Sequence, residues 1–585
     1  MLKILKNLKQ YWLEIFVIII LLIIQANADL ALPDYISRIV NNGITEATLD
    51  AQNYKSSYIL IEGAKMLGVA AISTICGITV MFLSSRVGAK LGKNLREKTF
   101  QKILSFSISE FKEFSTASLI TRSTNDIQQI QNLVSMMFRV IVYAPIIGIG
   151  GFFKVMAANH NPMAWIIGVA VASVLIIVLL LFIIAMPKFK KLQTLVDKLN
   201  LVSREILTGI PVIRAFNTEK KEEARFEKAN KDLMKTFMFV NNAMNLMMPT
   251  LMMVMNLISL LTIWVGAKNV DIGAIQVGDI MAFLQYTMQI VMAFLMISMI
   301  SIILPRASIS ANRINEVLEK ENSIKDPENP KQFDETKKGL VEFKKVSFQY
   351  PDADEPLLND ISFTAEPGKT TAIIGSTGSG KTTIINLIPR FYDVTQGEIL
   401  VDGVNIKEVT QKDLRNIIGF VPQKGLLFSG TIESNIKYNN KNMSDEQMKI
   451  SAEIAQCTEF INEKNNKYNS EIAQGGSNVS GGQKQRLSIA RAIAKDPEIL
   501  IFDDSFSALD YKTDVKLRKA LSQKTKNKTV IIVAQRINTI LNAEQIIVLE
   551  DGKIVGKGTH QELMKNCEVY KQIAISQLSK EELNG

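Results

Sequence analysis

The sequence predicts a membrane-embedded bundle of six α-helices followed by a soluble α/β domain. Six apolar runs long enough to cross a bilayer lie before residue 305, and strand-like alternation begins only after residue 340. The chain of 585 residues is also too long for one ordinary hydrophobic core. We therefore expect a transmembrane domain over 1–320, a linker over 321–338, a soluble domain over 339–578 and a polar tail over 579–585.

The charge and the rare residue types exclude several classes of protein. Lys and Arg number 67 against 57 Asp and Glu, which gives a formal net charge of +10. Such a charge suits nucleic-acid binding, but here it is interleaved with long apolar runs. A membrane protein with a basic cytoplasmic side is therefore expected, without a nucleic-acid partner. The three cysteines and two histidines are scattered, which excludes a disulfide scaffold, a zinc site and Cys–His catalysis.

The basic residues between the apolar runs predict the orientation in the membrane. They are concentrated in 86–132 and 188–240, whereas 34–56 contains only Arg38 and Lys55. Because positive loops stay in the cytoplasm, both basic segments and both termini are expected there. The lysines before the first run resemble a signal peptide, but no small-residue cleavage pattern follows, so a retained helix is expected. The six expected spans are 15–33, 66–83, 133–156, 163–187, 244–266 and 280–304.

A phosphate-binding loop is the first chemical motif of the soluble domain. Thr370–Ile374 has the pattern of a short buried strand, and a glycine-rich loop and a helical run over 383–388 follow it. Glycines let backbone N–H groups close around phosphates, Lys381 reaches the β- and γ-phosphates, and the Thr382 hydroxyl ligates Mg²⁺. The ATP-binding residues predicted here are Gly375, Ser376, Thr377, Gly378, Ser379, Gly380, Lys381, Thr382 and Thr383.

Two further motifs follow the phosphate-binding loop. A second apolar strand, 498–502, ends in Asp503 and Asp504, and a carboxylate at such a strand end suits the Mg²⁺ site. Ahead of this strand, a helical run is preceded by the sequence Asn478-Val479-Ser480-Gly481-Gly482-Gln483. With this segment the chain resembles the ATP-binding cassette (ABC) family, whose signature sequence has Ser-Gly-Gly-Gln in this place.

The resemblance covers nearly the whole chain and implies further roles. It implies that Tyr350 stacks on adenine and that Gln423, in Val-Pro-Gln, is the glutamine-loop residue that joins Thr382 and Asp503 in the Mg²⁺ site. Six spans ahead of one cassette resemble an ABC exporter half-transporter. Such chains work as dimers, because each ATP is held between one subunit's phosphate-binding loop and the other's signature segment. The residues implied to act on the partner's ATP are Ser480, Gly481, Gly482 and Gln483.

Two positions depart from the family's pattern. Asp504 stands where the family has its catalytic glutamate, and Gln535 stands where it has the switch histidine. The Asp504 carboxylate is one methylene shorter, and a misplacement of that order costs about 10²-fold in rate. Gln535 cannot donate as a cationic or proton-shuttling imidazole. Together they predict a degenerate site that binds ATP and hydrolyses it poorly, in a heterodimer whose partner completes the competent site. A homodimer with two slow sites is the alternative.

Methionines and polar residues in the spans bear on the cargo. Of 24 methionines, 13 lie in 234–299, with helical spacing on the fifth and sixth spans. They suit either a surface that accepts many apolar shapes or simple packing against helices and lipid. Four polar residues of the spans are expected to face a water-filled cavity or each other, although two of them, Asp29 and Arg139, could instead lie near a membrane boundary. The four are Asp29, Arg139, Gln285 and Gln289.

The resemblance thus implies an ATPase that exports hydrophobic or amphipathic compounds, of the bacterial multidrug type, with ATP and Mg²⁺ as cofactors. The expected location is the plasma membrane of a prokaryote, as a multi-pass protein in contact with lipid and with a second half-transporter. Coupling loops near 115–126 and 209–218 would link the cassettes to the spans. Lipid or peptide transport, import on the same architecture, and a channel-like regulatory subunit remain alternatives.

Overall fold

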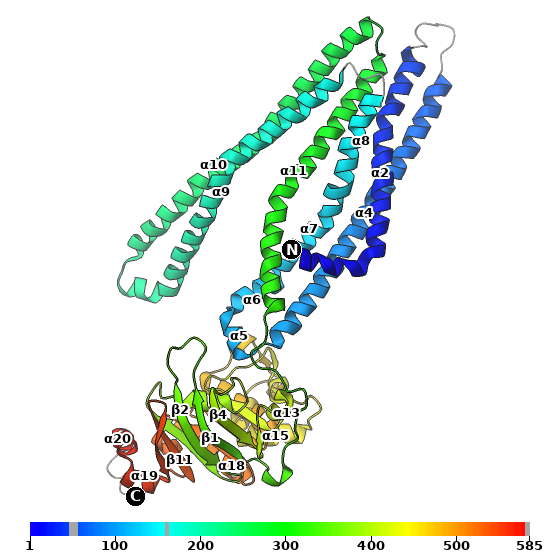
Figure 1. The fold of residues 1–585 in the computed structure, drawn as a ribbon. Coiled ribbons are helices and arrows are strands. Elements are labelled where there is room, and N and C mark those ends of the chain that lie inside the picture. Colours follow the sequence, from blue (N-terminus) through cyan, green and yellow to red (C-terminus); the bar gives the residue numbers. More distant parts are fainter. Residues whose placement is uncertain (46–55, 158–162, 579–585) are drawn as a thin grey trace. The chain divides into compact units, whose positions relative to one another are not determined.

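The computed structural model describes residues 1–45, 56–157 and 163–578 (Figure 1). The chain forms two compact units. The helical unit comprises Met1–Leu104 and Thr116–Lys320, and the α/β unit comprises Ser105–Ser115 and Glu321–Gly585. The α/β unit is therefore built from two stretches of chain that are far apart in the sequence.

Long helices make up the helical unit, as the apolar runs predict. Five of them are long and apolar enough to cross a membrane within the described residues, and the predicted fourth span falls in α9, whose apolar part Ala164–Leu180 is shorter. The helices and helical turns of this unit are α1 (Leu2–Leu5), η1 (Lys6–Tyr11), α2 (Trp12–Arg38), η2 (Ile39–Thr45), α4 (Ser56–Leu104), α6 (Thr116–Ser123), α7 (Asn125–Phe138), η3 (Arg139–Tyr143), α8 (Ala144–Ala157), α9 (Ala164–Ala215), α10 (Glu219–Asp271) and α11 (Val277–Glu319).

Polar groups inside the helical unit are bonded to one another across helices. The Asp34 carboxylate of α2 accepts a hydrogen bond from Tyr286 of α11 and forms an ion pair of 2.7 Å with Lys154 of α8. Asp29, one turn earlier on α2, accepts hydrogen bonds from Ser73 and Tyr143. Such pairing offsets the cost of placing charged and polar groups among apolar helices.

Two sheets form the frame of the α/β unit. The larger has the strand order β12-β11-β3-β10-β9-β6, in which all pairs except β11–β12 are parallel, and the smaller is antiparallel with the order β2-β1-β4-β5. The strands are β1 (Val341–Phe348), β2 (Leu358–Ala365), β3 (Thr370–Gly375), β4 (Gln396–Val401), β5 (Val404–Asn405), β6 (Ile418–Val421), β7 (Gly430–Thr431), β8 (Glu471–Ile472), β9 (Ile499–Asp503), β10 (Thr529–Val533), β11 (Gln545–Glu550) and β12 (Lys553–Gly558).

The helices of this unit are α5 (Ile108–Glu113), η5 (Glu335–Lys337), α12 (Lys381–Leu387), α13 (Gln411–Asn416), α14 (Ile432–Ile436), α15 (Asp445–Ile454), α16 (Thr458–Asn462), η6 (Lys467–Asn469), η7 (Gln474–Gly476), α17 (Gly481–Ala494), α18 (Tyr511–Lys524), η8 (Ile537–Thr539), α19 (His560–Asn566) and α20 (Glu568–Gln577). The central strands β3, β9 and β10 are mostly apolar because both faces are covered, one by the smaller sheet and α12 and the other by helices that include α17 and α18. Their carboxyl ends meet at one edge, where Val533 is paired with Asp503.

A short segment just ahead of the predicted coupling loop 115–126 belongs to the α/β unit. Helix α5 belongs to the α/β unit, whereas α6, which covers most of the predicted segment, belongs to the helical unit. Ile108 packs against the core of the smaller sheet, and Glu110 accepts a hydrogen bond of 3.1 Å from the backbone N–H of Ser323. The sequence does not reveal this packing, because a six-residue helix with few apolar residues leaves no periodic signal. The coupling role of 115–126 stays a prediction.

The turn between β4 and β5 carries a pH-sensitive group. Asp402 and Gly403 both have positive φ, as a two-residue hairpin turn of type I′ requires. The Asp402 carboxyl is 3% exposed, and burial is the main cause that raises its pKa to about 6. The backbone N–H of Gly339 donates a hydrogen bond of 2.6 Å to this carboxyl.

We expect Asp402→Asn to flatten the pH dependence of stability. Because the pKa is higher in the folded chain, the neutral carboxyl stabilises the fold below about pH 4. That contribution is lost as the pH rises to about 6, and it amounts to no more than about 3 kcal/mol. Asparagine keeps the turn geometry and does not titrate. Thermal unfolding of the two purified chains between pH 4 and 7.5 checks this, and parallel curves would contradict it.

Candidate functional site

The phosphate-binding loop has the strand–loop–helix geometry that the sequence predicts. It joins β3 to α12, and two of its glycines, Gly378 and Gly380, have φ of +86° and +97°. Gly380 is the residue that precedes α12, and a Cβ there would lie 2.5 Å from a methyl carbon of Leu358. A side chain at this position would therefore both strain the backbone and clash.

The polar groups of this loop suit a phosphate ligand. The Lys381 ammonium donates hydrogen bonds of 2.9 Å and 2.6 Å to the backbone oxygens of Gly375 and Ser376. Burial lowers the pKa of Lys381, while the charges of the two nearby aspartates oppose that shift. The Ser379 hydroxyl is buried and has no hydrogen-bond partner among the described residues. A buried donor without a partner is costly, and a phosphate oxygen would satisfy it.

A hydroxyl and a carboxylate meet where the Mg²⁺ site is predicted. The Thr382 hydroxyl donates a hydrogen bond of 3.1 Å to the carboxylate of Asp503, the last residue of β9. Burial raises the pKa of Asp503, and the neighbouring charge of Asp504 acts in the same direction. Oxygen ligands of these two kinds are those that Mg²⁺ prefers, so the residues present fit the ion.

Asp504 lies beside the glutamine loop. It has a φ of +44°, and its backbone N–H donates a hydrogen bond of 2.9 Å to the oxygen of Val533 at the end of β10. Its side chain is 7% exposed, and the amide nitrogen of Gln423 donates a hydrogen bond of 3.3 Å to its carboxylate. The structure thus brings together Gln423, Asp503 and Asp504 at one strand edge.

Gln535 differs from Asp504 in its surroundings. It lies two residues beyond the end of β10, and its side chain is exposed and makes no hydrogen bond to any described residue. Its backbone oxygen accepts a hydrogen bond of 2.9 Å from Gln577 of α20. The backbone is therefore held in place while the side chain remains available.

The signature segment forms the amino-terminal cap of α17. The Ser480 hydroxyl accepts a hydrogen bond from the backbone N–H of Gln483, and the Gln483 side chain accepts one from the backbone N–H of Ser480. Ser480 and Gly481 are exposed, and a Cβ on Gly481 would meet no atom within 4 Å. Among the described residues, Ser480 and Gln483 are hydrogen bonded to each other, not to the chain's own phosphate-binding loop.

Tyr350, the predicted adenine-stacking residue, is joined to the loop and to α5. Its hydroxyl lies 2.9 Å from that of Thr383, and its ring packs edge-on against Tyr392. The Lys112 ammonium of α5 lies 5.5 Å from the centre of the Tyr350 ring and 5.6 Å from that of Tyr392. The Tyr392 hydroxyl is the main cause that raises the pKa of Lys112. Sequence reasoning missed Lys112, because nothing in the sequence links it to an aromatic pair more than two hundred residues away.

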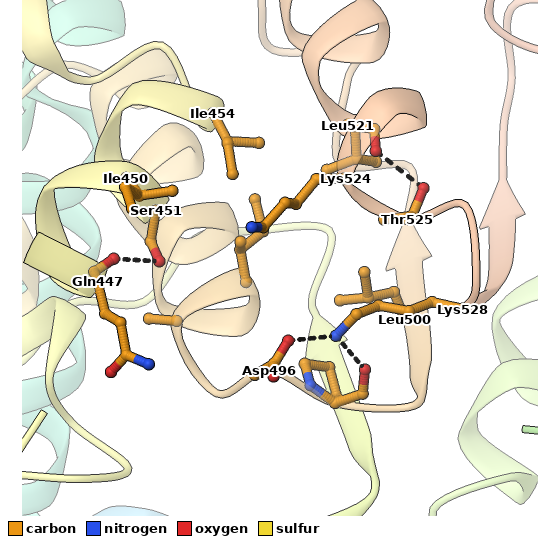
Figure 2. A pocket seen from close by; sticks show the side chains of 13 residues that line it. Gln447, Ile450, Ser451, Ile454, Asp496, Leu500, Leu521, Lys524, Thr525 and Lys528 are labelled. Carbon is orange, nitrogen blue, oxygen red and sulfur yellow. Dashed lines mark hydrogen bonds and ion pairs between the residues drawn. The ribbon is translucent and has the colours of Figure 1, made fainter. Parts of the chain in front are cut away.

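The α/β unit also contains a cavity that lies apart from the predicted nucleotide-binding residues (Figure 2). It has a volume of about 130 Å³ and lies between α15, α18 and the start of β9. Its Lys528 side chain is already paired with Asp496 at 2.6 Å, as the dashed lines of Figure 2 show. No residue of the phosphate-binding loop or signature segment lines it.

These features define the class of the protein: a membrane-spanning helical unit joined to a P-loop nucleotide-binding unit. The family models agree, since the ABC transporter transmembrane region matches residues 15–294 and the ABC transporter model matches residues 358–507. An ABC transporter ATP-binding protein of Mycobacterium tuberculosis is 40% identical over 576 residues, which cover 98% of this chain and 97% of the relative. YfiB of Bacillus subtilis, described in the same words, is 38% identical over 579 residues, which cover 99% of each.

The chain belongs to the ABC transporter family. It is a half-transporter, with one membrane region fused to one cassette, and this arrangement implies a dimer partner. The structure of a bacterial Atm1-family ABC exporter with ATP bound has the same fold, with a TM-score of 0.80 and 23% identity over 98% of this chain and 99% of that one.

Proposed function

We propose that the chain is the degenerate-site subunit of a heterodimeric ABC exporter. The observation that carries this proposal is Asp504. A buried aspartate, bonded to Gln423, occupies the position that directly follows the Mg²⁺-site carboxylate. A side chain one methylene shorter holds its carboxylate about 1.5 Å back, and misplacement on that scale costs about 10²-fold in rate. Gln535, in place of the family's switch histidine, also lacks an imidazole that could transfer a proton.

The residues that would hold ATP are those of the loop, with Tyr350 against the adenine ring. Thr382, Asp503 and Gln423 would hold Mg²⁺, which supplies charge neutralisation at the phosphates when it is bound. This chain's own contribution is a loop with an unpartnered Ser379 hydroxyl and a Lys381 ammonium that is held close to the loop by its carbonyl oxygens. Both groups are then positioned for a polyphosphate.

Two exposed surfaces support the proposal that a partner subunit completes the ATP sites. The signature segment of α17 presents Ser480 and Gly481 to the outside of the chain. The turn between α9 and α10 is also apolar and exposed, with Phe216 at 76% and Val212 at 60%. YfiB and YfiC are two relatives of this chain that both come from Bacillus subtilis, and YfiC is 32% identical over 488 residues. Related chains therefore occur together in one organism, as a heterodimer requires.

The cargo would be a hydrophobic or amphipathic compound, exported across a prokaryotic plasma membrane. Relatives from Mycobacterium and Bacillus support a bacterial setting, and the similar solved structure is described as an exporter. Of the methionines with helical spacing on the fifth and sixth spans, Met248, Met252, Met288 and Met292 are exposed on the surface of the chain. Exposure suits either cargo or lipid, so their role stays a prediction.

ATPase activity of the chain in lipid tests the proposal. The chain is purified alone and together with a half-transporter that is encoded beside it. We expect activity only in the pair, with loss when the partner's glutamate is replaced and little change in Asp504→Asn. Brisk activity of the chain alone, reduced by Asp504→Asn, would instead establish a homodimer in which Asp504 and Gln535 suffice.

The aromatic contact of Tyr350 predicts a graded loss of nucleotide affinity. We expect Tyr350→Ala to lower ATP affinity about tenfold, because stacking of a base on an aromatic ring is lost. Tyr350→Phe keeps the ring and removes only the bond to Thr383, so its affinity should stay within about threefold. Fluorescent-nucleotide titration of the full-length variants measures both. An equal loss in the two variants would mean that the hydroxyl, not the ring, matters.

A further inference from the structure

A cavity inside the helical unit has a mixed lining that none of the nucleotide chemistry uses. It has a volume of about 280 Å³ and lies between α4, the α7–η3 segment and α11. Hydroxyl groups, one cation and methionine side chains line it together. The lining includes Ser84 of α4, Ser135 and Met137 of α7, Arg139 of η3 and Met296 of α11.

Among the described residues of this lining, Arg139 is the only charged one. Its guanidinium has no hydrogen bond or ion pair with any described residue, and the carboxylate of Asp29 is bonded to Ser73 and Tyr143 instead. The residue opens a π-helical turn, Arg139–Tyr143, and such turns inside α-helices are frequent at functional sites. The Arg139 side chain is exposed on the surface of the chain, and a cation on a membrane-spanning helix is costly unless an anion or water meets it.

The hydroxyl of Ser84 is a second polar group in the cavity that has no partner among the described residues. The Ser84 side chain is 3% exposed although it lines the cavity. Hydroxyls on helices can bond a carbonyl oxygen one turn back, as the half-buried Ser135 does at 3.0 Å. A buried donor without a partner, in the same lining as a cation without a partner, fits an acceptor atom that the chain itself does not supply.

The remaining wall is apolar and adaptable. Met137 and Met296 contribute flexible thioether side chains, which accommodate differing apolar shapes. A volume of about 280 Å³ is at the small end of ligand sites, so it suits a headgroup and one ring system. The lining therefore offers an anion both polar groups, from Arg139 and Ser84, and an apolar surface.

We propose that this cavity binds amphipathic organic anions, with a sulfonate, carboxylate or phosphate group on Arg139 and Ser84 and an apolar ring system against the methionines. The inference rests on the proposed function in taking the anion to be cargo. Acidic membrane lipid carries the same headgroup chemistry, and the experiment below separates the two sources. Guanidinium groups bind such anions through directed, charge-assisted hydrogen bonds.

Two fluorescent probes with the same ring system test the charge requirement. The probes are 1-anilinonaphthalene-8-sulfonate and its uncharged analogue N-phenyl-1-naphthylamine, titrated without ATP against the full-length protein in phosphatidylcholine nanodiscs. After subtraction of empty nanodiscs, Arg139→Gln should weaken sulfonate binding by about 10- to 100-fold and leave the uncharged probe within about twofold. Arg139→Lys should recover part of the affinity, and Ser84→Ala should lose about threefold to tenfold.

Arg306→Gln is the matched control, because Arg306 is an exposed arginine of α11 outside the lining. Equal loss of both probes in Arg139→Gln, or equal loss of the sulfonate in the control, would overturn the proposal. Adding phosphatidylglycerol to the nanodiscs identifies the source. If phosphatidylglycerol leaves sulfonate binding unchanged, the cavity binds cargo. If phosphatidylglycerol displaces the sulfonate probe from the unsubstituted protein but not from Arg139→Gln, the cavity binds acidic lipid. Because no ATP is present, failure here is distinct from failure of the degenerate-site proposal.

Discussion

Asp504→Glu should raise ATP hydrolysis at the site of this chain by about 10²-fold. The added methylene would carry the carboxylate about 1.5 Å toward the position from which a base orients the attacking water. The local backbone is already fixed by the bond from the Asp504 N–H to Val533, so the change is confined to the side chain. Phosphate release by a complex whose partner site has been silenced measures the effect.

Asp503→Glu is the matched control for this gain. It adds the same methylene one residue earlier, but there it displaces the carboxylate that Thr382 contacts at 3.1 Å. We expect hydrolysis to fall in this variant. If Asp504→Glu leaves the rate unchanged even when Gln535→His is added, the short carboxylate is not what limits the site, and the degenerate-site proposal fails.

Ser480→Ala should slow hydrolysis of the complex by about 10- to 100-fold. The exposed hydroxyl that caps α17 would lose its hydrogen bond to the γ-phosphate held by the partner, and a bond to a charged group carries about this weight. The effect should fall on the competent site, although the substitution is made in the other subunit. Steady-state ATPase of the pair, with ATP binding to each subunit measured separately, checks this expectation.

Ser444→Ala separates the lost cap from the lost phosphate contact. Ser444 caps α15 in the same way, with its hydroxyl accepting from the N–H of Gln447. Each substitution should destabilise its helix by about 1 kcal/mol. Only Ser480→Ala should change hydrolysis. Similar losses of activity in the two variants would mean that Ser480 acts through the stability of the cassette alone.

Local signals carried most of the fold and of the nucleotide site. The apolar runs, the glycine-rich loop and the acidic end of β9 are each recognisable from a few consecutive residues. The structure places the loop between a strand and a helix, as predicted, with Thr382 bonded to Asp503. Contacts between distant segments were beyond sequence reasoning. Nothing in the sequence near Lys112 points to Tyr350, and nothing near Ser84 shows that its hydroxyl lacks a partner.

Two of the polar residues in the spans lie together. The sequence predicts that Asp29, Arg139, Gln285 and Gln289 face a water-filled cavity or each other, and the Gln289 amide donates a hydrogen bond of 3.0 Å to the backbone oxygen of Asp29. Gln285, four residues earlier on α11, is exposed on the chain. Helical periodicity places residues on a face, but which face meets a neighbour depends on how the helices pack.

The membership of α5 in the α/β unit limits how this protein can be cut into parts. A fragment that begins at residue 321 would keep every nucleotide-binding motif. It would nevertheless lack Ile108 from its core and leave the Ser323 N–H without the Glu110 carboxylate. It would also uncover the Tyr350–Tyr392 pair on the side that Lys112 occupies. An expression fragment meant to report the nucleotide affinity of the native subunit therefore needs the 105–115 peptide supplied in trans or fused to it.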